Sequence, residues 1–200
     1  MDGELSELGK EQARLVGGRL ASYVFDIGIV SDLKRARDTA AAIVEQNTTL
    51  ENMVEWSSVR ERNFGVFEGR PHSELREVQD SMTEREKSSW RPPGGETGDE
   101  FRTKVEQFLK DLSQEVENLE REKPTVLLVT HSGFIRQLNL VFVSSHGCLM
   151  PEGNDEFSTY LGSRQGWSPN TGVSTYTLHR AGDGRVGVQC QVSGCVQHLR

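Results

Sequence analysis

Cysteine and long apolar runs are scarce in this 200-residue sequence, and each scarcity excludes a class of protein. Three cysteines (Cys148, Cys190 and Cys195) leave an odd thiol in any pairing and form no Cys-x-x-Cys, which argues against a disulfide framework or a structural zinc site. Apolar runs such as 125–129 are far too short for a membrane span. The first residues resemble neither a secretory signal nor a transit peptide, so we expect a cytoplasmic protein.

Positive charge is also lacking overall. The net charge of −7 and the pI near 5.3 argue against a nucleic-acid partner, because such proteins need a basic footprint to displace counterions from phosphates. Any anionic ligand must therefore meet a local positive pocket. No repeat or linker divides the chain, and 34% hydrophobic residues suffice for one core, so residues 1–200 are expected to form a single domain.

Helical and strand patterns alternate along the chain, which predicts an α/β fold. Strands are expected at 25–30, 125–130, 173–178 and 186–192, with a turn at 181–184 between the last two. Helices are expected at 6–20, 31–44, 101–119 and 134–142, the third introduced by a capping box of Thr97 and Glu100, and 73–78 is a short amphipathic stretch. The segments 57–69 and 144–169 show no clear periodicity.

Two polar segments follow predicted strands, and ligands of open α/β sheets bind beyond such strand ends. Arg35 is expected near the start of a helix with a Ser/Asp opening, and His131 precedes Ser132 and Gly133 at another helix start. Both places suit an anion. Spacing alone leaves His131 equally compatible with a structural hydrogen bond in the turn, and the neighbouring Lys34 and Arg37 are expected to be solvated.

Glu61 lies in an irregular segment between two arginines. If it is partly buried it could donate a proton, and otherwise it is an ordinary loop ion pair. The remaining histidines have no ligand-like spacing with one another or with cysteines and carboxylates, so no metal site is predicted.

Several motifs, taken in order over nearly the whole chain, resemble those of the histidine phosphatase superfamily, which has the phosphoglycerate-mutase-like fold. They are Leu5–Ala13, Ser31–Ala40, Arg60–Gly65, Pro93–Thr97, Val129–Gly133 and Asn170–Gly172. The resemblance implies a three-layer α/β sandwich with a mostly parallel sheet. The sequences of residues 59–75, 92–97 and 169–172 most resemble those of members that hydrolyse fructose 2,6-bisphosphate. This resemblance implies a cytoplasmic regulator of glycolysis with possible nuclear or mitochondrial association.

The resemblance also implies a mechanism without metal or cofactor, in which a phosphoryl group passes from a small sugar phosphate to a histidine and then to water. Glu61 would protonate the leaving oxygen and later activate water, and His131 would stabilise the phosphoryl oxygens. The substrate would be bound by Arg35, Ser132 and Gly133.

One element of the family pattern is absent, because no Arg-His-Gly occurs in the sequence. In the family this motif ends the first strand and carries the nucleophile. We therefore expect an N-terminally truncated domain whose sheet lacks that strand, which makes it less stable, prone to association and a poor catalyst. The alternatives are a pseudophosphatase that binds a phosphorylated ligand or a protein partner, and a truncated isoform that does not fold alone.

Overall fold

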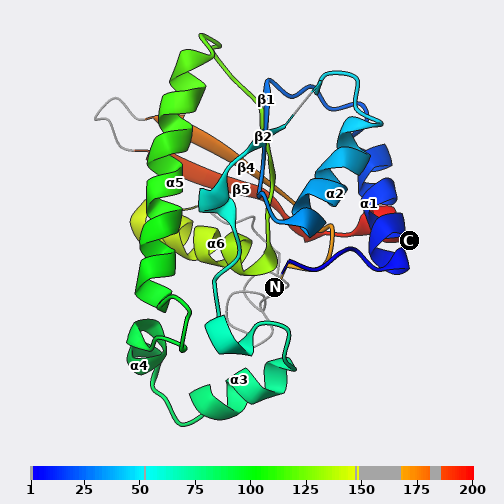
Figure 1. Ribbon diagram of the computed structural model, residues 1–200. Coiled ribbons are helices and arrows are strands. Elements are labelled where there is room, and N and C mark those ends of the chain that lie inside the picture. Colours follow the sequence, from blue (N-terminus) through cyan, green and yellow to red (C-terminus); the bar gives the residue numbers. More distant parts are fainter. Residues whose placement is uncertain (1, 52, 147, 149–167, 181–185) are drawn as a thin grey trace.

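The computed structural model describes residues 2–51, 53–146, 148, 168–180 and 186–200 (Figure 1). The helices are α1 (Glu7–Leu20), α2 (Lys34–Val44), α3 (His72–Gln79), α4 (Glu84–Ser89), α5 (Gly98–Asn118) and α6 (Ser132–His146), with short 3-10 turns at Ser57–Val59, Gly65–Phe67 and Gln197–Leu199. The strands are β1 (Ile27–Val30), β2 (Val54–Glu55), β3 (Val126–Val129), β4 (Val173–Arg180) and β5 (Val186–Cys195). No helix in these ranges is long and apolar enough to cross a membrane.

The strands form two sheets. In the first, β1 lies between β2 and β3 and all three run parallel, with Val30 opposite Val129. In the second, β4 and β5 pair antiparallel. Within the described residues β1 is the only strand hydrogen-bonded to β3, which is therefore an edge strand. The predicted mixture of helices with a parallel sheet is confirmed.

Helices cover both faces of the parallel sheet, as Figure 1 shows, with α1 and α2 on one side and α5 on the other. Successive strand residues point to opposite faces. Accordingly Ile29 belongs to the core that α5 and α6 cover, whereas Val30 packs with α1 and α2. The β4–β5 ribbon joins the first of these cores through Val188, and the Tyr176 ring packs against that of Phe142 of α6, with the centroids 5.2 Å apart and the ring planes tilted by 58°.

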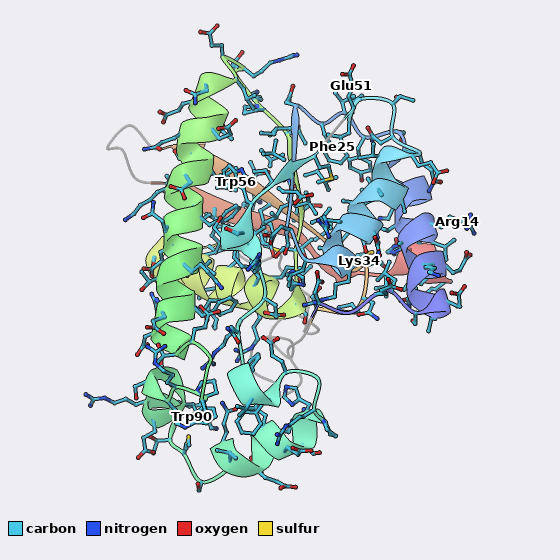
Figure 2. The ribbon with its side chains drawn as sticks, viewed as in Figure 1. Arg14, Phe25, Lys34, Glu51, Trp56 and Trp90 are labelled. Atoms are coloured by element: carbon cyan, nitrogen blue, oxygen red, sulfur yellow. The ribbon has the colours of Figure 1, made fainter. Side chains whose placement is uncertain are left out.

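A lobe of α3 and α4 lies beyond the first turn of α5 (Figure 1). Trp90 belongs to it (Figure 2), and its ring centroid is 6.0 Å from that of Phe67. The capping box of Thr97 and Glu100 at the start of α5 is confirmed. This lobe matters because it faces the end of the sheet at which polar residues gather.

Most predicted elements are present, with differences at their ends. Helix α6 continues to His146 although residues 143–145 are exposed, and both ribbon strands are longer than expected because antiparallel pairing extends beyond their apolar residues. Two short elements were not predicted, β2 and α4, although Thr83 and Glu86 form a capping box that announces the latter. The turn at 181–184 and most of 144–169 lie outside the described residues.

Candidate active site

The carboxyl ends of β1 and β3 bring together two segments that are 100 residues apart. Ser31 follows β1 and His131 follows β3, and the parallel register makes them neighbours. His131 Nε2 lies 2.8 Å from Ser31 Oγ, and both side chains are buried. His131 also precedes α6, because its carbonyl oxygen accepts a hydrogen bond from the Ile135 amide at 2.9 Å. Strand pairing therefore fixes this imidazole at the sheet end.

The electrostatic surroundings keep His131 neutral. Burial, assisted by the positive charge of Arg35, lowers its pKa to about 3. A neutral imidazole has one N–H donor and one acceptor, so it can donate to an anion through one nitrogen only. A bound anion would add negative charge beside the ring and favour its protonation.

Glu61 is half-buried on the loop that follows the first 3-10 turn, and it faces the start of α6. Its Oε2 accepts a hydrogen bond from the Gly133 amide at 2.8 Å, and its Oε1 accepts one from the Arg62 amide at 2.9 Å. Burial raises the pKa of Glu61, although these two donors and the charges of Arg35 and Lys104 oppose the shift. The carboxyl group therefore keeps its proton to a higher pH than an exposed glutamate, as a general acid requires.

Gly133 occupies a position that no other residue fits without displacement. A Cβ atom there would collide with the Glu61 carboxylate. In this structure the Gly133 amide donates its hydrogen bond to the Glu61 carboxylate, where a substrate oxygen was expected to accept it. Binding of substrate by Ser132 and Gly133 stays a prediction, and Ser132 begins α6 directly after His131.

Arg35 lies in the first turn of α2 and is half-buried. Within the described part of the chain its guanidinium forms no hydrogen bond or ion pair, yet its charge acts on both His131 and Glu61. The expected Ser/Asp cap is wrong, because Leu33 is the N-cap and has no side-chain bond. The Lys34 amide instead donates to Asp2 Oδ1 at 2.6 Å, so a carboxylate lies where an anion was predicted.

The other basic residues of α2 have partners. Lys34 pairs with Asp38 at 3.0 Å, and the nearest oxygen of Glu55 is 3.8 Å from Arg37. These exposed pairs agree with the expectation that neither side chain belongs to the pocket.

Two residues near the site were not singled out from the sequence, Ser31 and Lys104. Ser31 shares the signal that identified His131, a polar residue directly after a buried strand. Lys104 is three residues after Phe101 and four before Phe108, which places a cation on the apolar stripe of α5. It pairs with Glu96 at 2.9 Å, and its charge lowers the pKa of both Glu61 and His131.

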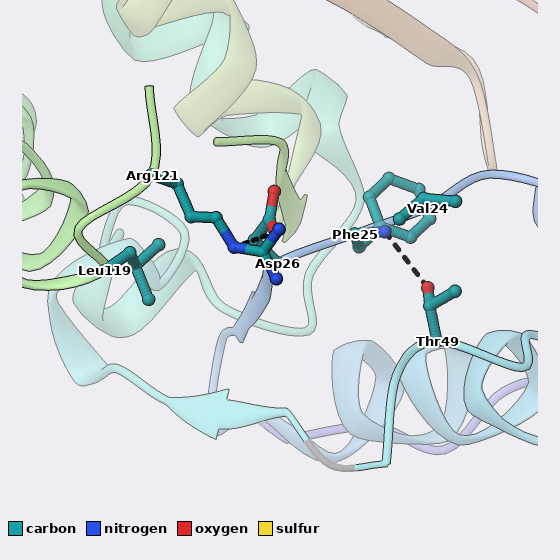
Figure 3. Close-up of a pocket in the computed structure, with 6 residues that line it drawn as sticks. All are labelled: Val24, Phe25, Asp26, Thr49, Leu119 and Arg121. Atoms are coloured by element: carbon teal, nitrogen blue, oxygen red, sulfur yellow. Dashed lines mark hydrogen bonds and ion pairs between the residues drawn. The ribbon is translucent and has the colours of Figure 1, made fainter. Parts of the chain in front are cut away.

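The opposite end of the sheet has a hollow of about 490 Å³ (Figure 3). Its carboxylate and guanidinium, Asp26 and Arg121, are 3.4 Å apart and form an ion pair. In the described ranges no three His, Cys, Asp or Glu residues could hold a metal ion together. The arrangement at the carboxyl ends, with a guanidinium that has no partner among the described residues, a neutral imidazole and a carboxyl of raised pKa, suits phosphoryl transfer.

Comparison with known proteins agrees with this chemistry. Residues 1–146 match the model of the histidine phosphatase superfamily, branch 1. Fructose-2,6-bisphosphatase TIGAR of Bos taurus is 29% identical over 245 residues, covering 100% of this chain and 88% of that protein. TIGAR B of Danio rerio is 31% identical over 212 residues, covering 90% and 79%. A mycobacterial glucosyl-3-phosphoglycerate phosphatase superposes with a TM-score of 0.74 at 22% identity, covering 98% and 89%, which shows the same phosphoglycerate-mutase-like fold.

Proposed function

The chain belongs to the histidine phosphatase superfamily, and on that premise we propose that it is a sugar-phosphate phosphatase acting through Arg35, Glu61 and His131. Fructose 2,6-bisphosphate is the proposed substrate and its 2-phosphate the group removed, because relatives named for that activity match over almost the whole chain. Lowering this metabolite would make the protein a regulator of glycolysis. The observation that carries the proposal is the placement of Glu61. Its carboxylate accepts a hydrogen bond from the amide of Gly133, two residues after His131.

The proposed chemistry gives each side chain one task. Arg35 binds the phosphoryl oxygens bidentately, since its guanidinium has no partner among the described residues and two N–H groups match two oxygens. His131 donates to a third oxygen. Glu61 gives its proton to the leaving sugar oxygen as the P–O bond breaks, and it regains a proton from the water molecule whose oxygen forms the new bond to phosphorus, so the products are the free alcohol and inorganic phosphate.

The route through a phosphohistidine, which the resemblance implies, needs a histidine in line with the leaving oxygen. The sequence contains no Arg-His-Gly. His131 is hydrogen-bonded to Ser31, and its proposed task is to contact the phosphoryl oxygens, not to attack in line. This observation favours a second candidate function, a pseudophosphatase that binds a phosphorylated ligand without turnover.

The test is phosphate release from fructose 2,6-bisphosphate and from a panel of sugar monophosphates by the purified chain. Turnover that Glu61→Gln and Arg35→Gln each reduce at least 100-fold, with Arg37→Gln unchanged, supports the phosphatase. Turnover that is equal in all variants comes from a contaminant and refutes it. No turnover, together with calorimetric binding of inorganic phosphate that Arg35→Gln abolishes, supports the pseudophosphatase instead.

A further inference from the structure

Ser31 is a buried hydroxyl residue at the carboxyl end of β1 to which the proposed chemistry gives no task. Its side chain is fully enclosed, with an exposed fraction of 0%, so the hydroxyl group needs its hydrogen-bond partners within the protein. The structure shows two such partners among the described residues. The Leu33 amide donates to Ser31 Oγ at 3.4 Å, and His131 Nε2 lies 2.8 Å from the same oxygen.

The direction of the contact with His131 follows from the hydroxyl hydrogen. An amide N–H can only donate, so the Leu33 contact uses a lone pair of Oγ and leaves the hydrogen free. Within the described part of the chain, the only acceptor bonded to this hydroxyl is His131 Nε2. A buried hydroxyl hydrogen without an acceptor is destabilising. Ser31 therefore donates to Nε2, and that nitrogen must carry a lone pair.

The ring of His131 then has its own hydrogen on Nδ1. Burial lowers the pKa of His131 to about 3, so the ring is neutral at pH 7 and carries a single hydrogen. Among the described residues Nδ1 has no hydrogen-bond partner, and it is not one of the enclosed polar atoms that lack one. The nitrogen that remains for a ligand is thus the one that can donate.

We infer that Ser31 is a positioning residue, which holds His131 in the tautomer whose Nδ1–H donates to a phosphoryl oxygen of the ligand. The inference rests on the proposed function, in which His131 donates to that oxygen. Ser31 acts only through the ring, because the hydrogen bond at one imidazole nitrogen decides whether the other is protonated. In the opposite tautomer Nδ1 would present a lone pair to the anion, and the contact would be repulsive.

The tautomer can be measured without any turnover. Heteronuclear NMR of the purified chain, labelled with nitrogen isotope in its histidines, distinguishes the protonated from the unprotonated ring nitrogen. The His131→Gln variant identifies which signals belong to this ring among the five histidines. At pH 7 and without phosphate we expect the Nδ1–H form in the original chain. In Ser31→Ala the donor to Nε2 is gone, so this form should lose its predominance.

The second measurement is the calorimetric affinity for inorganic phosphate. Ser31→Ala should weaken it by about fivefold or more, because the ring no longer presents a fixed donor to the anion. Ser31→Thr keeps a hydroxyl group at the same place. It should restore the Nδ1–H form and an affinity within about twofold of the original, which a loss of packing alone would not explain.

Thr130→Val is the matched control. It removes a hydroxyl beside His131 in the sequence, one that donates to the Val59 carbonyl at 2.6 Å and not to the ring. The tautomer and the phosphate affinity should both stay unchanged in this variant. Thermal melting must show that each variant is folded.

An Nε2–H ring in the original chain would overturn the inference, because Ser31 would then only accept. A Ser31→Ala variant that keeps both the Nδ1–H form and the full phosphate affinity would also overturn it. Either result, with phosphate binding still dependent on Arg35, would leave the proposed anion pocket intact. The expected tautomers in a folded chain that binds no phosphate would contradict the proposed function and confirm only the arrangement of Ser31 and His131.

Discussion

Replacing Gly133 by alanine tests how tightly Glu61 is held. A Cβ atom built there would lie 2.8 Å from Glu61 Cδ and 2.9 Å from Oε2, closer than real side-chain contacts, so the carboxylate must move. That movement breaks the hydrogen bond from the Gly133 amide and disturbs the one from Arg62.

The two effects on stability oppose each other. A hydrogen bond to a charged group contributes about 1.5 to 3 kcal/mol, whereas alanine is favoured over glycine within a helix by about 1 kcal/mol. We therefore expect the Gly133→Ala variant to be less stable by about 1 to 2 kcal/mol. If Glu61 is the general acid, its displacement should also slow any turnover by a factor of about 100 or more.

Urea unfolding followed by tryptophan fluorescence would measure the stability. Gly18→Ala is the matched control, because a Cβ there meets only Gln46 Oε1 at 3.4 Å, an ordinary contact. The control should be as stable as the original chain or up to about 1 kcal/mol more stable. A Gly133→Ala variant as stable as Gly18→Ala, with unchanged phosphate release or phosphate binding, would refute the argument about Glu61.

Three further predictions concern stability. His131 is neutral in the fold with a pKa of about 3 and gains a proton on unfolding below its ordinary pKa of 6.5, so stability must fall as the pH drops through this window. The free energy of unfolding should decrease by about 2 to 3 kcal/mol more in the original chain than in His131→Gln between pH 7 and pH 4.5, and parallel pH curves would contradict this. Asn47→Ala should lower the free energy of unfolding by about 2 to 4 kcal/mol, because the buried amide donates to the carbonyls of Leu20 and Tyr23 and its oxygen accepts from two backbone N–H groups. A loss of less than about 1 kcal/mol in urea unfolding would contradict this. Thr97→Ala removes the cap of α5 and should lower stability by about 1 kcal/mol, measurable as a lower urea midpoint with an unchanged slope.

Periodicity and strand ends made much of the fold predictable. The apolar run before His131 predicts β3 and the stripe that begins at Phe101 predicts α5, because each pattern reflects burial of a local element. The two residues of β2 are exposed and carry no such pattern. They form a strand only because β1 provides hydrogen-bonding groups beside them, which is a contact between distant segments.

A cavity beside Glu61, lined by Arg62 and Arg136, shows the same limit. Arg62 and Arg136 belong to a loop and a helix that are far apart in the sequence, and nothing local in either segment says that they face one space. Only the tertiary fold brings both side chains to one cavity. Their common position is visible only in the structure, because the sequence shows two ordinary arginines.

In the triplet Arg60, Glu61 and Arg62, the backbone conformation determines whether Glu61 forms an ion pair with a neighbouring arginine or is free to act as a proton donor. The sequence allowed Glu61 to pair with a neighbouring guanidinium, but Arg60 has extended backbone angles, and side chains of extended residues point to alternate sides. Arg60 consequently binds the Asp32 carboxylate through Nε and Nη2, both at 2.6 Å, and Arg62 binds a backbone carbonyl. Glu61 is left with amide donors only, and a carboxyl without a cation at contact distance is one whose pKa burial can raise.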